Sequence, residues 1–365
     1  MFFRPLPWRI RAGEGLFVFA RALALLSLAL GCACGPALAP KQAMFFVEGC
    51  PDGGAAIDPA SAVWELHTGP ILTRGEPGSW DAADVLNPSV ARVNGVFHNL
   101  YSGFDGTAWR SGLATSEDGI GWKKHMGAVL SPDPATWESG YIAANGAVLH
   151  DGEQFHYWYQ AGPRGSTAIG LARSADAIAW DKHPQPVLRN GPPGSWDETA
   201  VGDPYAVGCG NTYYLYYVGQ NRKGIQRLGV ARSTNGVHWR KSHANPILDT
   251  GPPGSFDQRG LGEPAVIRAS GEWWMLYTGR DESERRRMGW ARSANGIDWA
   301  KASGAEPFEG GQPWNSAVVC DAALLAEGDT IRMWYGGGDR PSPDENLNGQ
   351  IGLAELTAAR GATGR

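Results

Sequence analysis

Short apolar runs separated by turn residues make up most of the chain after about residue 60. In one repeat the runs cover residues 204–207, 213–218, 227–233 and 239–241. Gly, Pro, Asn and Asp stand between the runs, which is typical of short β-strands joined by tight turns. The 3.6-residue period of an amphipathic helix does not appear in this region. The pattern therefore predicts an all-β protein.

The runs recur with a nearly constant period. A Gly-Ser-aromatic-Asp turn, with two degenerate copies, places its aromatic residue at positions 80, 137, 196, 256 and 314. These positions are 57, 59, 60 and 58 residues apart. A Ser-x-Asp or Ser-x-Asn turn that leads to a Trp recurs with the same period, and the Trp residues are expected to pack between repeats. Four short strands repeated five times at this length are typical of propeller blades.

The two ends of the chain complement each other. The fifth repeat stops after its third strand, at residues 351–354. The missing fourth strand has a counterpart before the first repeat, at Trp64-Glu65-Leu66. We therefore expect the N-terminal strand to complete the last blade and close a five-bladed β-propeller of four-stranded blades, which leaves no open sheet edge. This domain would span residues 60–356, followed by a tail at 357–365.

The first forty residues have the pattern of an export signal. Several Arg residues precede an apolar stretch at 22–30, and small residues follow. Residues 29–32 resemble a lipoprotein cleavage box that ends at Cys32, and cleavage after Ala39 is the alternative. Residues 1–40 are therefore predicted to be a leader and 41–59 a linker. The mature protein would be secreted, or held at a membrane only through an N-terminal lipid anchor.

Charge and cysteine content narrow the classes of partner. The 365-residue chain has a formal net charge of −5 and no basic stripe, which argues against nucleic acid as a partner. Beyond the leader, Cys50, Cys209 and Cys320 lack metal-binding spacing. We expect these three residues to be buried small apolar side chains, and we expect no metal site built from them.

Five polar residues occupy equivalent positions, at the predicted start of the first strand of each repeat. They are Asn87, Asn145, Asp203, Glu263 and Asp321. The first strand of a propeller blade lines the central channel, so these side chains should surround one mouth. Grouped carboxyls in a low-dielectric channel shift one another's pKa, as acid–base sites require. The alternative is that Asn and Asp only begin turns before Pro, which does not explain Glu263.

Other side chains near this mouth are candidates for binding. Asp84 lies three residues before the first of the five positions. Trp109, in the loop between the second and third strands, has no Trp counterpart in other repeats, so it could stack on a sugar ring or simply pack. The Arg run at 285–287 is expected to form a solvated rim that could meet an anionic group. The acids could hold Ca²⁺ in the channel, although no loop has calcium-binding spacing.

The repeat and its Asp-Pro and Glu-Pro strand starts resemble the five-bladed superfamily of arabinanases, xylosidases, levansucrases and invertases. Glycoside hydrolase family 43 is the nearest family, and the resemblance covers roughly residues 60–356. It implies a glycosidase that hydrolyses a plant- or microbe-derived oligosaccharide or polysaccharide without a required cofactor. It also implies Glu263 as the general acid and Asp203 as the acid that tunes its pKa and orients the sugar.

One position departs from the family pattern. Asn87 stands where the family has its base or nucleophile, and an amide cannot take a proton near neutral pH. Asp321 or Asp84 would then have to serve, with Asn87 and Asn145 holding sugar hydroxyls. Alternatively, the propeller binds carbohydrate without cleaving it. A sialidase-like enzyme is a third alternative, because the Ser-x-Asp-Gly turns resemble Asp boxes, although sialidases have six blades.

Overall fold

The computed structural model describes residues 47, 50, 63–327 and 330–357. The chain divides between Met44 and Phe45 into two units, and all described residues lie in the second. They form twenty β-strands and one 3₁₀ turn, η1 (Pro313–Asn315). The all-β prediction is therefore confirmed.

The segments predicted at the two ends of the chain lie largely outside the described residues. The predicted leader (1–40, with Cys32) lies outside the described residues, as do most of the linker (41–59) and of the tail (357–365). Within the described part of the chain, no helix has the length and apolarity needed to span a membrane.

The strands pair antiparallel in five consecutive groups, here called units one to five. Units one and two contain β2 (Asp84–Val93), β3 (Val96–Phe104), β4 (Trp109–Ser116) and β5 (Lys123–Lys124), then β6 (Ile142–His150), β7 (Phe155–Gly162), β8 (Ala168–Ser174) and β9 (Asp181–Lys182). Units three and four contain β10 (Ala200–Cys209), β11 (Thr212–Gln220), β12 (Gln226–Ser233) and β13 (Arg240–Lys241), then β14 (Gly260–Ala269), β15 (Glu272–Arg280), β16 (Arg286–Ser293) and β17 (Ala300–Lys301). Unit five contains β18 (Val318–Glu327), β19 (Thr330–Gly338), β20 (Gln350–Thr357) and β1 (Val63–Leu66).

Strand β1 is the fourth strand of unit five although it comes first in the chain. It pairs antiparallel with β20, and Leu66 lies opposite Ala354. In unit three, Lys241 lies opposite Ala231 in the same way. The N-terminal strand thus occupies the place that the third unit fills with β13.

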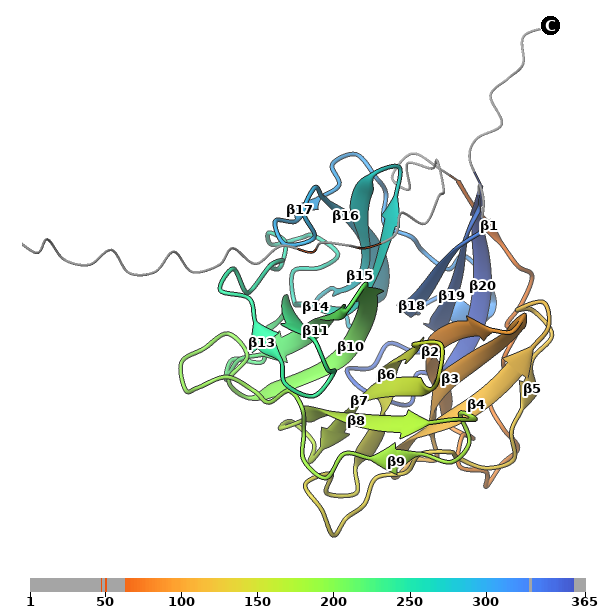
Figure 1. Cartoon of the computed structure of the whole chain (residues 1–365). Coiled ribbons are helices and arrows are strands. Elements are labelled where there is room, and N and C mark those ends of the chain that lie inside the picture. The colour runs from red at the N-terminus through yellow and green to blue at the C-terminus, as the bar shows by residue number, and fades with distance from the viewer. Residues whose placement is uncertain (1–46, 48–49, 51–62, 328–329, 358–365) are drawn as a thin grey trace, which may run out of the picture. The chain divides into compact units, whose positions relative to one another are not determined.

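The units do not share one closed sheet. Units three to five form a sheet of twelve strands, and units one and two form a sheet of eight. The first strands nevertheless contact one another in succession, from β2 through β6, β10 and β14 to β18, and β18 contacts β2. Figure 1 shows these first strands on the inside, with the short strands β5, β9, β13 and β17 on the outside.

Aromatic side chains connect neighbouring units. Trp158 of β7 donates from Nε1 to the carbonyl of Gly236 in unit three (2.9 Å) and packs edge-on against Trp239. Trp334 of β19 donates in the same way to the carbonyl of Gly119 in unit one (2.8 Å). Trp239 and Trp122, which follow Ser-x-Asx turns, therefore pack against Trp residues of a neighbouring unit, as the repeat predicts.

The Gly-Ser-aromatic-Asp turns also have a structural role. In unit three, the ring of Trp196 covers Gly219 and Gly229, where an added Cβ would come within 2.4 and 2.6 Å of it. A residue larger than Gly would displace the ring at either position. The recurring aromatic residue is thus part of the core rather than a sugar platform.

One prediction about the cysteines is wrong. Cys50 and Cys209 form a disulfide across 159 residues of sequence, while Cys320 is a free, buried thiol. Spacing along the chain could not reveal the pair, because only the fold brings Cys209, the last residue of β10, beside Cys50.

Candidate active site

The five polar positions share an unusual backbone conformation. Each lies at a β-bulge inside the first strand of its unit, where the pairing register shifts. Their φ angles are positive: Asn87 49°, Asn145 47°, Asp203 42°, Glu263 42° and Asp321 57°. Non-glycine residues adopt this conformation at a cost of about 1–3 kcal/mol, and such strain concentrates at functional sites. A bulge also redirects a side chain, so the repeat of five bulges aims five polar groups at one place.

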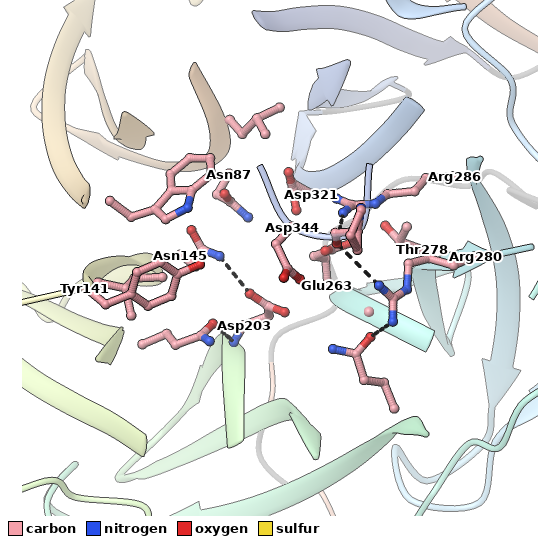
Figure 2. A pocket seen from close by; sticks show the side chains of 17 residues that line it. Asn87, Tyr141, Asn145, Asp203, Glu263, Thr278, Arg280, Arg286, Asp321 and Asp344 are labelled. Carbon is pink, nitrogen blue, oxygen red and sulfur yellow. Dashed lines mark hydrogen bonds between the residues drawn. The ribbon is translucent and has the colours of Figure 1, made fainter. Parts of the chain in front are cut away.

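These residues are not strand starts, as the sequence suggested. Asp203, for example, is the fourth residue of β10 and Glu263 the fourth residue of β14. A capping role at the start of a strand therefore does not account for them. All five side chains line one cavity of about 110 Å³ (Figure 2). A smaller cavity of about 40 Å³ is lined by the same five residues and by residues that directly follow them in the chain.

Asp203 is held by its neighbours on two sides. Asn145 donates from Nδ2 to Asp203 Oδ1 (3.1 Å), and the backbone N–H of Asp203 donates to Gln160 Oε1 (3.2 Å). Burial, reinforced by the nearby carboxylate of Glu263, raises the pKa of Asp203 to about 7. The side chain therefore holds a proton up to nearly neutral pH.

Glu263, Cys320 and Asp321 form a cluster in which Glu263 is half-buried and the other two are buried. One side-chain atom from each lies within 4.8 Å of the other two, and Cys320 Sγ donates to Asp321 Oδ2 (2.9 Å). Burial, and then the charge of Glu263, raises the pKa of Asp321. Among the described residues, Glu263 Oε2 and Asp321 Oδ1 have no hydrogen-bond partner although both are buried. Buried polar atoms of this kind are available to a bound ligand or water.

Two buried guanidinium groups balance these carboxyls. Arg280 ends β15 and Arg286 begins β16, and both line the cavity. Burial lowers the pKa of Arg280. At Arg286 burial acts in the same direction, but Glu263, Cys320 and Asp321 together outweigh it and raise the pKa. The cavity thus combines proton-holding carboxyls with fixed positive charge.

A loop that sequence reasoning missed covers this cavity. Residues 339–349, here called the crossing loop, connect β19 to β20. Arg286 donates from Nη2 to the carbonyls of Ser342 (3.2 Å) and Pro343 (2.6 Å), and Arg280 Nη1 donates to Pro343 O (3.3 Å). The eleven residues of the loop, against five at 221–225 and five at 281–285, were a signal in the sequence.

The prediction that Asp84 acts as a base or binds substrate is wrong. Its carboxylate is fully buried and accepts the backbone N–H groups of Asn346 (2.6 Å) and Gly349 (2.8 Å) in the crossing loop. It does not line the cavity. Asp84 therefore anchors the loop and is not placed to act as a base or to bind substrate.

Trp109 and the Arg run occupy different places from those expected. Trp109 begins β4, is 4% exposed and stacks on Phe104 with ring centroids 4.9 Å apart. It lines the cavity, but its packing against Phe104 leaves little surface for a sugar. The expectation of a solvated rim is wrong for Arg286, which is 7% exposed and faces the cavity because alternate residues of a strand point to opposite sides.

The cluster around Glu263 does not suit calcium. Ca²⁺ takes six to eight oxygen ligands, whereas this cluster contributes two carboxyls and a thiol. The charge of Arg286 beside it would also repel a cation. An ion elsewhere in the channel stays a prediction.

Comparison with known sequences supports the same class of fold. Residues 137–315 match the family model described as the glycosyl hydrolases family 32 N-terminal domain. The chain is 25% identical over 237 residues to the uncharacterized protein Rv1502 of Mycobacterium tuberculosis, covering 60% of this chain and 74% of that protein. It is 28% identical over 126 residues to the 1,2-beta-oligomannan phosphorylase of Thermoanaerobacter sp. (strain X514), covering 32% and 42%.

Solved structures agree. The beta-1,2-mannobiose phosphorylase from Listeria innocua, in complex with beta-1,2-mannobiose, matches with a TM-score of 0.63 at 16% identity over 80% of this chain and 96% of that chain. A thermostable family-43 glycoside hydrolase matches with a TM-score of 0.59 at 16% identity over 77% and 93%. At these identities the likeness shows the fold, which is that of the propeller glycoside hydrolases and phosphorylases. The resemblance drawn from the sequence is confirmed.

Proposed function

We propose that the five units form a closed five-bladed propeller and that the protein is a glycosidase for β-mannosides, with β-1,2-linked oligomannosides as its substrates. The succession of contacts from β2 to β18 and back to β2 supports the closed ring. The substrate is proposed from the names of the two phosphorylases reported above. The observation that carries the activity is the meeting of Asp203, Glu263 and Asp321 in one cavity.

The chemistry of these residues suits glycoside hydrolysis. The reaction usually needs one carboxyl that donates a proton and another that activates water or attacks the sugar. Asp203 holds a proton near neutral pH, and Glu263 lies beside both Asp203 and Asp321 as their common charged neighbour. Asn87 and Asn145 also face the cavity and offer amide groups to sugar hydroxyls. Asn87 replaces the carboxyl that the family uses as a base, but Asp203, Glu263 and Asp321 still supply carboxyls to the cavity.

Phosphorolysis is the second candidate. Phosphate is already a nucleophile, so it needs no general base, which agrees with Asn87 at the base position. Arg280 and Arg286 are buried at the cavity and could hold a phosphate through charged hydrogen bonds. A carbohydrate-binding propeller without turnover is the third candidate.

The assay that tests this proposal uses β-1,2-mannobiose with and without inorganic phosphate. Release of mannose alone at equal rates in both conditions indicates hydrolysis. Formation of mannose 1-phosphate, only with phosphate present, indicates phosphorolysis. Binding without turnover in either condition would leave the non-catalytic reading.

Activity should fall as the pH rises through about 7. A carboxyl whose pKa is raised to about 7 is protonated below that pH and ionised above it. Glu263, Arg280 and Arg286 are the charged groups that face Asp203. We expect log kcat/KM to decline above pH 7 in the wild type. Asn cannot titrate, so the decline above pH 7 should disappear in Asp203→Asn. If this variant shows the same decline, another group causes it.

Cys320 should act as a positioning residue for Asp321. Cys320→Ala removes the donor to Asp321 Oδ2, and a hydrogen bond to a neutral carboxyl contributes about 0.5–1.5 kcal/mol, so kcat/KM should fall by up to about tenfold. Cys320→Ser keeps a donor and should retain most of the activity. Thermal unfolding of both variants provides the control, and equal activities in Ala and Ser would remove this role.

The predictions about export, the mature N-terminus and the bounds of the domain are also proposals. We propose that residues 1–40 direct export, that Cys32 or a site after Ala39 defines the mature N-terminus, and that the propeller occupies 60–356. Mass spectrometry of the exported protein would separate the lipid-modified form from the secreted one.

A further inference from the structure

A second, larger cavity shares several lining residues with the first. It has a volume of about 360 Å³, and its lining includes Ala200, Val201 and Gly202 at the start of β10 in unit three. Asp203 lines both cavities, whereas Glu263 and Asp321 line only the first. We call this second cavity the unit-three groove. Asp203 thus lies where the groove meets the cavity.

The walls of the groove suit a neutral, hydroxyl-rich ligand. Its polar groups include the amides of Gln160, Gln220 and Gln226. Its charged groups are already paired: Arg164 with Asp344 and Glu345, Arg259 with Glu282, and Arg280 with Glu284. Since no net charge is left to attract an anion, the groove fits a saccharide better than a phosphate or a carboxylate.

Two of the three side-chain amides are held by hydrogen bonds within the protein, and the third is available to bind a ligand. Gln160 accepts from the backbone of Asp203 and donates to Thr167 Oγ1 (3.0 Å). Gln226 accepts from Arg280 Nη2 (2.5 Å). The side chain of Gln220 makes no hydrogen bond to another group in the part of the chain that the structure describes, and it is half-buried in the groove. It can therefore bind a ligand hydroxyl without breaking an existing contact.

We propose that the unit-three groove binds the leaving-group sugar and that Asp203 donates the proton to the glycosidic oxygen. This inference rests on the proposed glycosidase function. The sugar that is attacked occupies the first cavity, beside Glu263 and Asp321. When the bond between C1 and the glycosidic oxygen breaks, its electron pair stays on that oxygen, which takes the proton of Asp203. In hydrolysis, water adds to C1 and gives its proton to Glu263, and exchange with solvent restores both carboxyls.

This assignment differs from the roles that the family resemblance implies. There, Glu263 is the general acid and Asp203 tunes it. Here, Asp203 lines both the first cavity and the groove in which the leaving group would stand, whereas Glu263, although it neighbours Asp203, lines only the first cavity. Proton donation requires hydrogen-bond reach of the leaving oxygen, so position decides between the two residues.

The leaving group itself provides the test. A 2,4-dinitrophenolate departs without protonation, whereas a sugar alkoxide does not. Asp203→Asn should therefore lose at least 100-fold in kcat/KM on β-1,2-mannobiose but less than tenfold on 2,4-dinitrophenyl β-mannoside. Glu263→Gln should lose at least 100-fold on both. The reverse pattern, in which only Glu263→Gln is rescued by the better leaving group, would overturn the assignment.

Gln220 tests the groove independently. Gln220→Ala should lower kcat/KM on β-1,2-mannobiose about tenfold more than on the dinitrophenyl mannoside, through loss of one or two hydrogen bonds. Gln154→Ala, in the turn at the far end of β6, is the matched control and should change neither value. Equal effects of Gln220→Ala on both substrates would exclude the groove.

Failure of the glycosidase proposal can be distinguished from failure of the groove proposal. If the wild type cleaves neither substrate, the glycosidase proposal fails, and calorimetry then tests the groove alone. The wild type should bind β-1,2-mannobiose more tightly than mannose, and Gln220→Ala should remove that difference. Equal affinity for both sugars in the wild type would exclude a second sugar site.

Discussion

Glu263→Gln should lower kcat/KM about 10²–10⁴-fold on every glycoside that the protein cleaves, with the fold unchanged. Gln has nearly the same shape as Glu but can neither accept a proton from water nor attack a sugar. Glu263 is also the charged neighbour that raises the pKa of both Asp203 and Asp321. Its replacement should therefore lower both pKa values and leave the cavity without its shared proton near neutral pH.

Steady-state kinetics on mannobiose and on an aryl mannoside would measure this loss. Glu153→Gln is the matched control, because Glu153 is exposed in the turn between β6 and β7. That variant should keep full activity. Near-wild-type turnover by Glu263→Gln would show that the cavity described here is not where the bond is cleaved.

Asp197→Asn should lower the free energy of unfolding by about 3 kcal/mol. Asp197 is buried and pairs with Lys241, and it also accepts hydrogen bonds from Ser195 (3.0 Å) and Tyr217 (3.4 Å). Removing one partner of a buried ion pair costs about 3–5 kcal/mol. Because the Lys241 side chain keeps 28% of its surface exposed, the low end of that range applies.

Unit five contains the corresponding double replacement. The same Asp–Lys or Glu–Lys pair occurs in units one to four, with Lys124, Lys182, Lys241 and Lys301. In unit five, Asn315 takes the place of the acid and donates to Tyr335 (3.0 Å), while Leu66 takes the place of the lysine. The two positions therefore change together.

A double-mutant cycle tests this coupling. Asp197→Asn and Lys241→Leu should each destabilise unit three, and the combined variant should be more stable than the sum of the two losses predicts. Chemical denaturation measures all three, and Asp181→Asn, on the exposed strand β9, is the control. Additive losses would mean that the pair contributes no interaction of its own.

The period of the chain predicted the strands well. Apolar runs set where strands form, and the complementary chain ends predicted that β1 pairs with β20. The Trp residues that follow the Ser-x-Asx turns predicted contacts between units, such as that of Trp239 with Trp158. Equivalent positions in a repeat also indicated which five residues meet at the cavity. Such local patterns carry the fold because each unit is built from neighbours in sequence.

The residues that complete the site could not be predicted in this way. Asp84 lies close in sequence to Asn87, yet its carboxylate points to the crossing loop, because Asp84 lies in the regular part of β2 and Asn87 lies within the bulge that follows. Arg286 looked like one of three exposed charges, and only its place on β16 turned it inward. The disulfide between Cys50 and Cys209 likewise joins segments that no repeat relates.

The sequence by itself determined the all-β units and the five equivalent polar positions, since strand period and repeat length are properties of neighbouring residues. The tertiary structure decided how the cavity is closed, charged and extended toward unit three. Those features depend on burial and on residues far apart in the chain that lie close together. Examples are the hydrogen bond of Arg286 to Pro343 and the cluster of Cys320 with Glu263. Burial sets the pKa of a carboxyl, and no linear pattern contains it.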